Sequence, residues 1–286
     1  MMVSASDLQE RLAAQNVRLA FFDVDGTLLG LDGSYSQRLK QAMIEVRRAG
    51  VKTAIASGRP KFAVDFLIDD LQLDAAGVYY TGALVYDPQT NINLLERPLQ
   101  AAQALQLLDR ARELQVYTEV CTRDDFYIEK YSPISSVHAM HLRVSPRTHC
   151  LHSVITAEPI FKLLMAVDEQ LQPGLLQLLE TEFPHLHFAY ACLPSYPSWS
   201  FVSVIDHSAC KNQAFDLLLD YHGVDASQVI AFGDADSDRI FLQRAGIGVA
   251  MGNAKPEIKQ VADIITDTAA NDGVAQILEM LSRCKV

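Results

Sequence analysis

The chain has 286 residues, of which 49% are hydrophobic and 21% charged, and its formal net charge at pH 7 is −11. This composition is typical of a globular protein with a substantial core, and the excess of negative charge argues against nucleic acid or an anionic membrane as a partner. No apolar stretch reaches the roughly 18 residues of a membrane span, and the first residues lack the basic and apolar regions of a secretion signal. We therefore expect a cytoplasmic protein, in which the five scattered cysteines are reduced thiols.

The first strong signal is an apolar run that ends in two acids. After a short amphipathic helix, residues 17–22 are almost continuously apolar, as in a strand buried on both faces of a parallel sheet. Asp23-Val24-Asp25-Gly26-Thr27 follows directly. Because alternate residues of a strand share a face, we expect Asp23 and Asp25 to project together at the carboxyl end of this strand, where open α/β sheets bind ligands.

Two neighbouring carboxylates repel each other, by about 1 kcal/mol at 4 Å in water and about 4 kcal/mol at an effective dielectric near 20. A divalent cation would remove this conflict. Asp-x-Asp-Gly also begins calcium-binding loops, and Asp-Gly alone is a turn signal. Thr27, Leu28 and Leu29 stand where a calcium loop needs further oxygen ligands, so the pattern favours an acidic site at the end of a strand.

Two further strands of this part are predicted to end at the same rim. The predicted elements are a helix carrying Leu39, Ala42, Met43 and Val46 that ends at Gly50, a strand at 51–56, a helix after Pro60 with Phe62, Phe66 and Leu67 inward, and a strand at 78–80. Ser57-Gly58-Arg59 follows the first of these strands, and Thr81-Gly82 follows the second. Small or polar residues therefore end all three strands.

From about Ala83 the pattern changes to shorter, alternating strands, which predicts an α+β insert with a partly solvated sheet. Its predicted elements are strands at 92–96, 117–121, 161–167, 185–190 and 201–205, and helices at 99–114 and after Pro173-Gly174. Buried strands and helices alternate again from Lys211: a helix to Tyr221, a strand at 229–232, a helix to Ala245, and strands at 247–250 and 264–266. The predicted organisation is an α/β core at residues 1–82 and 208–286, interrupted by the insert at 83–207.

The strand at 229–232 repeats the first signal. Gly233-Asp234 follows it, and Asp238 comes four residues later on the next helix or its first turn. Asp236, Ser237 and Asp238 could instead only cap that helix and complement its dipole. We favour the capping interpretation for Asp236, and metal ligation for Asp234 because it matches the end of the first strand.

Four histidines and a cysteine crowd one part of the insert: His138, His141, His149, His152 and Cys150. Such residues can bind zinc. Their spacing fits no finger pattern, and histidines on a loop-rich surface are common. We therefore do not expect a metal site there.

Four motifs, in order and over nearly the whole length, resemble those of the haloacid dehalogenase (HAD) superfamily of phosphotransferases. They are Asp23-Val24-Asp25-Gly26-Thr27, Ser57-Gly58-Arg59, Lys211, and Gly233-Asp234 with Asp238. Within the superfamily the chain looks like the Cof-type sugar-phosphate phosphatases, which have a C2B-like cap domain inserted after the third core strand. The resemblance implies a Rossmann-like parallel-sheet core, an inserted α+β cap, and a Mg²⁺-dependent phosphatase that acts on a small phosphomonoester through an aspartyl-phosphate intermediate.

The resemblance also implies roles for single residues. Asp23 would be the nucleophile, and Asp25 the general acid and base; Mg²⁺ would be held by Asp23, the backbone carbonyl of Asp25, and Asp234. Ser57 and Lys211 would bind the transferring phosphoryl group. Asp238 would orient Lys211 or metal-bound water without itself binding the metal. The residues implied to contact phosphate or substrate are Gly26, Thr27, Gly58, Arg59 and Ser237, although Arg59 could equally be a surface arginine.

Three residues depart from the family pattern. Ser237 and Thr81 stand where asparagine is usual, and Asn212 stands where glycine is usual. None removes a charged catalytic group, so we expect a working phosphatase with an unusual rate or specificity. Its substrate would be a sugar phosphate, or else pyridoxal phosphate or flavin mononucleotide. The alternatives are a phosphomutase with the same intermediate and a non-catalytic regulator that binds a phosphorylated metabolite. The sequence leaves the oligomeric state open.

Overall fold

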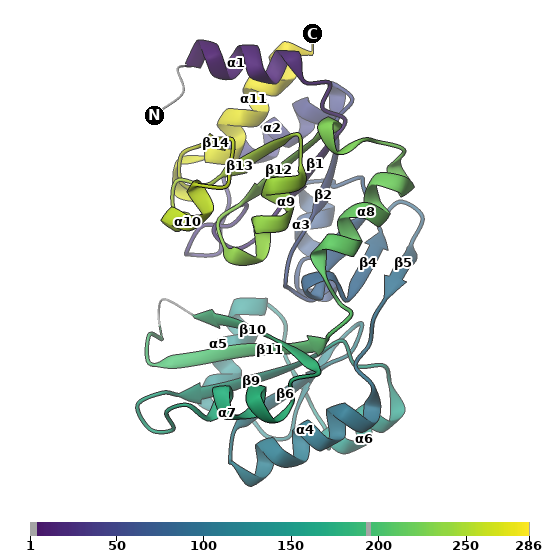
Figure 1. Cartoon of the computed structure of the whole chain (residues 1–286), viewed down its shortest axis with the longest axis vertical. Helices are drawn as coiled ribbons and strands as arrows, with labels where there is room; N and C mark the ends of the chain where they lie inside the picture. The colour runs from purple at the N-terminus through teal and green to yellow at the C-terminus, as the bar shows by residue number, and fades with distance from the viewer. Residues whose placement is uncertain (1–4, 193–195, 286) are drawn as a thin grey trace. The chain divides into compact units, whose positions relative to one another are not determined.

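The computed structural model describes residues 5–192 and 196–285, which form two compact units (Figure 1). Unit 1 comprises Met1–Gly58, Asp65–Leu95 and Lys211–Val286, and unit 2 comprises Arg59–Val64 and Glu96–Cys210. Within the described ranges, every helix is too short or too polar to span a lipid bilayer.

Unit 1 is built on a five-stranded parallel sheet in the order β14-β13-β12-β1-β2. Its strands are β1 (Leu19–Phe22), β2 (Lys52–Ile55), β12 (Val229–Gly233), β13 (Ile247–Ala250) and β14 (Ile264–Ile265). At the end of β1, Phe22 lies opposite Phe232 on one side and Ile55 on the other. The carboxyl ends of these strands therefore share one edge, and the parallel-sheet core expected from the sequence is confirmed.

Helices cover both faces of this sheet (Figure 1). The α-helices described in unit 1 are α1 (Ala5–Ala14), α2 (Gln37–Arg48), α3 (Asp65–Asp70), α8 (Lys211–His222), α9 (Arg239–Arg244), α10 (Pro256–Lys259) and α11 (Gly273–Cys284). On one face, Phe21 packs against Phe215 of α8 and Phe241 of α9, with ring centroids 6.3 and 5.0 Å away. The next residue, Phe22, points to the other face and stacks on Phe232. Burial on both faces explains why β1 is continuously apolar.

The prediction of a single helix after Pro60 is wrong. A 3-10 turn at Lys61–Ala63 comes first, and α3 begins only at Asp65. The ring of Phe62 stacks on Phe126, with centroids 6.3 Å apart, and both residues belong to unit 2. This long-range contact draws Phe62 away from the helix, so it is only half-buried, whereas Leu67 is buried as expected.

The third predicted strand, β3 (Gly77–Tyr79), touches the main sheet through a bridge between Ala56 and Val78. It also forms a small sheet with β4 (Leu84–Asp87) and β5 (Ile92–Glu96). The strand at 92–96, which the sequence analysis assigned to the insert, therefore lies in a sheet with β3. Its short alternating pattern resembles that of the insert strands, so the sequence alone could not separate the two.

Unit 2 is a six-stranded sheet in the order β10-β11-β9-β6-β7-β8, with helices on both faces. Its strands are β6 (Tyr117–Cys121), β7 (Phe126–Ile128), β8 (Arg147–Thr148), β9 (Lys162–Asp168), β10 (Leu186–Cys192) and β11 (Trp199–Asp206); its helices are α4 (Ala101–Glu113), α5 (Pro133–Leu142), α6 (Leu151–Ala157) and α7 (Leu175–Glu182). Leu163 of β9 packs with α4, α6 and α7, and its neighbour Leu164 packs with Ile134 of α5. Unit 2 thus has the α+β character expected of the insert.

Three of the crowded histidines lie on helices, whereas His149 is exposed in the short segment between β8 and α6. His138 is on α5 and is buried, with Nδ1 2.5 Å from Oε2 of the fully buried Glu119. His152 is on α6, with Nε2 2.7 Å from Oδ1 of Asp109. The sequence analysis missed α5 because its apolar residues show almost no helical periodicity. These two histidines have carboxylate partners instead of one another.

Candidate active site

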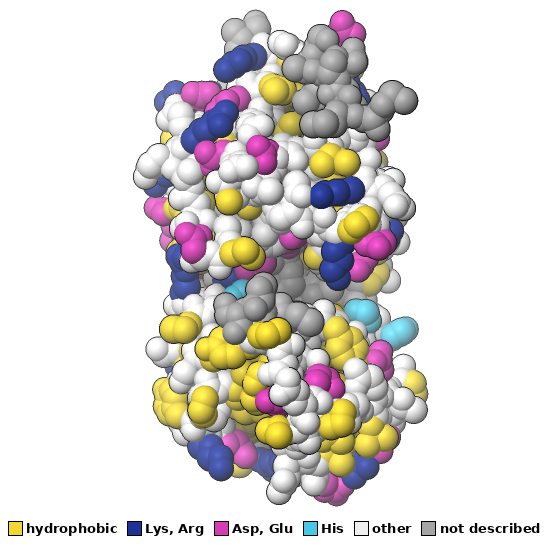
Figure 2. Space-filling view, turned by 90° about the vertical axis from the view of Figure 1, so that its left-hand side faces the viewer, with side chains coloured by type: hydrophobic (Ala, Val, Ile, Leu, Met, Phe, Trp, Pro, Cys, Tyr) yellow, Lys and Arg dark blue, Asp and Glu magenta, His cyan; other side chains and the backbone are white. Residues whose placement is uncertain are grey.

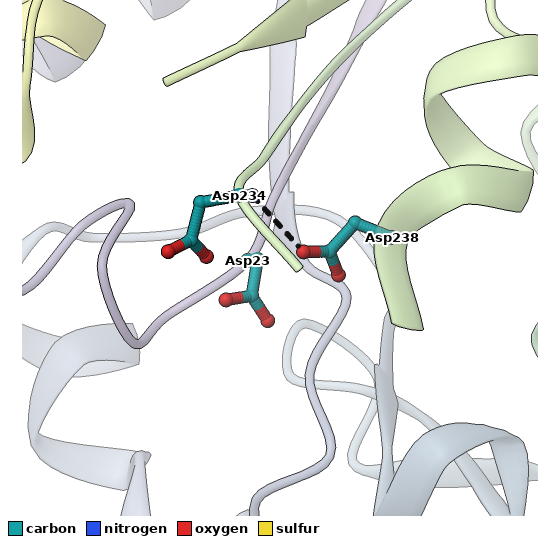
Figure 3. A group of neighbouring side chains, drawn as sticks. All are labelled: Asp23, Asp234 and Asp238. Atoms are coloured by element: carbon teal, nitrogen blue, oxygen red, sulfur yellow. Dashed lines mark hydrogen bonds between the residues drawn. The ribbon is translucent and has the colours of Figure 1, made fainter. Parts of the chain in front are cut away.

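Three acids meet at the carboxyl edge of the main sheet (Figure 3). Asp23 follows β1 and extends its pairing, because its N–H donates to the carbonyl of Phe232 over 3.0 Å. Asp234 follows β12, and Asp238 lies in the 3-10 turn that comes next. One carboxylate oxygen of each of these three acids lies within 4.8 Å of the other two. The structure therefore brings together the strand ends that the sequence singled out.

Two glycines allow this close approach. A Cβ atom at Gly26 would lie 2.3 Å from Oδ2 of Asp234, and the φ of +78° is in the left-handed region that favours glycine. A Cβ atom at Gly233 would lie 2.4 Å from the Cβ of Asp238. Any larger residue at either position would push the acids apart.

Asp238 is held by the chain itself. Its Oδ2 accepts hydrogen bonds from the backbone N–H groups of Asp234 (3.1 Å) and Ala235 (3.0 Å). Its Oδ1 accepts from the ammonium group of Lys211 over 2.9 Å, and that group also donates to the carbonyl of Ala56 over 3.1 Å. Both charged side chains are almost completely buried. Asp238 therefore fixes the turn and the lysine, whereas Asp23 and Asp234 face one another.

Without a cation, the ionised forms of these acids are unfavourable. Burial and the neighbouring charge of Asp238 raise the pKa of Asp23 well above its ordinary range, and Lys211 opposes this shift only in part. Burial, followed by the charge of Asp238, raises the pKa of Asp234 to about 7. In the part of the chain that the structure describes, Oδ1 of Asp234 is buried and has no hydrogen-bond partner. Clustered carboxylate oxygens with an unused acceptor suit a hard divalent cation such as Mg²⁺.

This electrostatic cost can be measured as a pH-dependent stability. Folded Asp234 holds its proton up to about pH 7, whereas its reference pKa is 3.8, so the free energy of unfolding falls as pH rises between these values. We expect Asp234→Asn to melt at a higher temperature than wild type in EDTA at pH 8, with a smaller gap at pH 5. Added Mg²⁺ should reverse the order at pH 8 by binding folded wild type.

The matched control is Asp236→Asn, which removes an exposed acid two residues away. The comparison is the melting temperature of wild type and of both variants, measured in EDTA and in Mg²⁺ at pH 5 and at pH 8. A variant Asp234→Asn that melts below wild type in EDTA at pH 8 would contradict this account of the site.

Asn253 belongs to this site and was missed by the sequence analysis. It follows β13, and its Nδ2 donates to Oδ2 of Asp234 (3.0 Å) and to the carbonyl of Gly26 (2.8 Å). Its Oδ1 accepts from the N–H of Ala269 over 3.1 Å. Asn253 thereby ties the loop after β1 to the loop after β12 and fixes one oxygen of Asp234. Its place after a strand of the same sheet was the signal that could have revealed it.

Replacing Asn253 should loosen Asp234 without removing a charged group. We expect Asn253→Ala to weaken the affinity for Mg²⁺ by about 10 to 100-fold, as is common for residues that orient a metal ligand. Titration of the melting temperature with Mg²⁺ measures the effect, with Asn271→Ala, an amide bound to Asp267 instead, as the control. An unchanged affinity for Mg²⁺ would show that Asn253 does not orient a metal ligand.

Ser57 is fixed by a strained turn. It is buried, its N–H donates to the carbonyl of Val78 (2.9 Å), and its own carbonyl accepts from the N–H of Thr81 (3.2 Å). Tyr80 and Thr81 have φ values of 51° and 58°, in the left-handed region that a β-branched residue rarely adopts. Asparagine tolerates this conformation better than threonine does. Threonine in place of the usual asparagine at position 81 therefore raises the conformational energy of the backbone.

Relief of this strain should be visible as added stability. We expect Thr81→Asn to raise the free energy of unfolding by about 1 kcal/mol, which is the low end of the usual cost of a strained backbone position. Urea denaturation measures the change. Thr118→Asn, in strand β6, is the control and should destabilise, because asparagine is unfavourable in strands. A loss of stability in Thr81→Asn would show that the threonine side chain does more for the turn than its strain costs.

Asp25 and Thr27 lie in the loop after β1. Asp25 is half-buried, and its charge contributes to the raised pKa values of both Asp23 and Asp234, so it is part of the same electrostatic group. Thr27 is buried, and its hydroxyl oxygen has no hydrogen-bond partner within the described ranges. This hydroxyl is a donor that the chain itself does not use.

The remaining predicted residues are placed less centrally. Ser237 is exposed, and its hydroxyl donates to Oδ1 of Asp238 over 3.2 Å. Gly58 approaches the hydroxyl of Thr81, which would lie 3.1 Å from an added Cβ atom. Arg59 is buried, so it is not a surface arginine, and its Nη2 lies 3.4 Å from Nε2 of His141 within unit 2.

Comparisons with known proteins show the family to which the chain belongs. The family model described as haloacid dehalogenase-like hydrolase matches residues 20–278. A predicted phosphatase from Streptococcus pyogenes is 30% identical over 92% of this chain and 97% of its own length. Pyridoxal phosphate phosphatase YbhA of Escherichia coli is 26% identical over 91% of this chain and 97% of its own. The crystal structure of a haloacid dehalogenase-like hydrolase from Bacteroides thetaiotaomicron has a TM-score of 0.82 at 25% identity and covers 92% of this chain and 98% of its own.

Proposed function

The chain belongs to the haloacid dehalogenase-like hydrolases and is a phosphomonoester hydrolase; from this premise we propose that it dephosphorylates a small metabolite with Asp23 as the nucleophile. The observation that supports the proposal is the position of Asp23, which directly follows a central strand and lies beside the buried Asp238 and the half-buried Asp234. Unit 2 would then be the inserted cap domain, with the bounds that its internal contacts give.

The proposed reaction has two displacements at phosphorus. In the first, a carboxylate oxygen of Asp23 forms a bond to phosphorus while the bond from phosphorus to the alcohol oxygen breaks, and Asp25 gives that oxygen its proton. In the second, Asp25 takes a proton from water as the water oxygen bonds to phosphorus, and the bond to Asp23 breaks. Inorganic phosphate leaves, and both aspartates return to their starting states.

We propose that Asp23, Asp234 and the backbone carbonyl of Asp25 hold Mg²⁺. The ion would supply positive charge that offsets the mutual repulsion of the carboxylates and the phosphate. The unused Oδ1 of Asp234 and the raised pKa values of Asp23 and Asp234 support this assignment. Asn253 and Asp238 would keep the two side chains in place.

The remaining groups of the site would bind the transferring phosphoryl group. The positive charge of Lys211 lowers the pKa of Asp23 against the other influences, which favours the ionised nucleophile. Because Asp238 holds the ammonium group, Lys211 is fixed before substrate arrives. The unpartnered hydroxyl of Thr27 and the hydroxyl of Ser57 would donate to phosphoryl oxygens.

We propose a small phosphorylated metabolite as the substrate, either a sugar phosphate or a phosphorylated cofactor. The Escherichia coli relative, whose name gives pyridoxal phosphate as its substrate, supports the second class. The test is phosphate release from a panel of sugar phosphates, pyridoxal phosphate and flavin mononucleotide, each with Mg²⁺ and with EDTA. We expect release with at least one of them, and only with Mg²⁺.

Other outcomes separate the alternatives. Isomerised product without free phosphate would identify a phosphomutase. Binding of a panel member without turnover, by folded protein with Mg²⁺, would identify a regulator instead of an enzyme.

A further inference from the structure

The two edges of the unit 2 sheet differ sharply. At one edge, β8 has only two residues, both exposed, and its Arg147 forms an ion pair with Asp125 over 2.9 Å. Short length and charge are the usual protection of an edge strand against pairing with another chain. At the other edge, β10 runs for seven residues, Leu186–Cys192, without lysine, acid or proline. Among the strands that the structure describes, β10 pairs only with β11.

Tyr190 of β10 (44% exposed) and Leu178 of the neighbouring α7 (39%) are exposed apolar side chains of this part of unit 2. Leu171 (79%), after β9, and Tyr196 (37%), before β11, are further exposed apolar residues of unit 2. Figure 2 shows hydrophobic side chains gathered on unit 2, in the lower part of the view. The hydroxyl of Tyr190 donates to Oε2 of Glu180 on α7 over 2.8 Å, so α7 lies next to the edge. An unprotected strand beside exposed apolar residues marks an interaction surface.

We propose that β10 pairs antiparallel with β10 of a second copy of this chain, around a two-fold axis at Ala189. The backbone edge of a strand is self-complementary in this arrangement, which closes as a dimer and leaves no new open edge. The pairing would join the two six-stranded sheets into one.

The register around Ala189 is chemically favourable. It places Phe188 opposite Tyr190 of the partner subunit, and aromatic pairs across strands are stabilising. On the other face it places His187 opposite Ala191 of the partner subunit. The strand has no charged residue that would meet a like charge. The occupant that fits β10 best is therefore β10 itself.

A cysteine at the axis tests the register. Opposite Cα atoms in antiparallel strands are about 4.5 to 5.5 Å apart, which is within disulfide range, so Ala189→Cys should form a reductant-sensitive dimer on oxidation. In the control, His187→Cys, the two introduced thiols would be offset by four residues, or about 13 Å, and should not cross-link. The same native cysteines are present in both variants. Absent or equal cross-linking in the two variants would overturn the proposal.

Paired charges test the same register in solution. In His187→Lys/Ala191→Lys, two pairs of like charges would face each other across the axis, and the mass should fall to the 31.7 kDa of one chain. In His187→Lys/Ala191→Glu, opposite charges would face each other, and the dimer should remain. Light scattering after gel filtration measures the masses, and circular dichroism shows that the variants fold. A wild-type chain that stays at 31.7 kDa at high concentration, or a dimeric double-lysine variant, would refute the pairing.

Discussion

Asp23→Asn should abolish phosphate release and still give a folded protein. We expect a loss of at least about 10³-fold in kcat, because the amide cannot form the bond to phosphorus that the proposed first step needs. Since burial already raises the pKa of Asp23, the neutral amide should also stabilise the metal-free protein at pH 8. Loss of activity together with a gain in stability distinguishes a removed nucleophile from a damaged fold.

The control for this experiment is Asp69→Asn, which removes an exposed acid from α3. It should leave both phosphate release and stability near wild type. If the kcat of Asp23→Asn were within about tenfold of that of wild type, Asp23 would not be the nucleophile.

Lys211→Met should have the largest effect on stability. It leaves Asp238 buried without its cationic partner, and removal of one member of a buried ion pair commonly costs about 3 to 5 kcal/mol. The variant should also lose most of its activity, because the positive charge near Asp23 is gone. Urea unfolding and phosphate release measure the two effects.

A second variant separates the two effects of Lys211. In Lys211→Met/Asp238→Asn the carboxylate that pairs with Lys211 is neutralised as well, so part of the stability should return while activity does not. Lys40→Met is the control, because its ion pair with Asp70 is exposed and should contribute less than about 1 kcal/mol. Equal stability of wild type and Lys211→Met would contradict the role given to the buried pair.

The sequence predicted the acidic strand ends because their signal is local. An apolar run that stops at a carboxylate can be seen within ten residues, and parallel strands bring such ends to one edge. Asp23 and Asp234 meet for this reason, although about two hundred residues separate them. Asn253 follows a strand of the same sheet, but a single amide after a glycine is too common a pattern to stand out.

Other features could not be predicted because they depend on long-range contacts. The pair of Glu119 and His138 joins β6 to α5, and neither residue shows by its neighbours that it is buried. Phe62 leaves the predicted helix to stack on Phe126. The left-handed conformation of Thr81 follows from the turn in which it lies, and nothing in the residue type indicates it.

The most direct test of Asp23 as a covalent nucleophile is the stereochemistry at phosphorus. A substrate whose phosphoryl group is made chiral with oxygen isotopes and sulfur can be hydrolysed and the configuration of the product determined. Two successive displacements, first by Asp23 and then by water, each invert the centre, so the account predicts net retention. Net inversion would show that water attacks the substrate directly, and the central claim would be wrong.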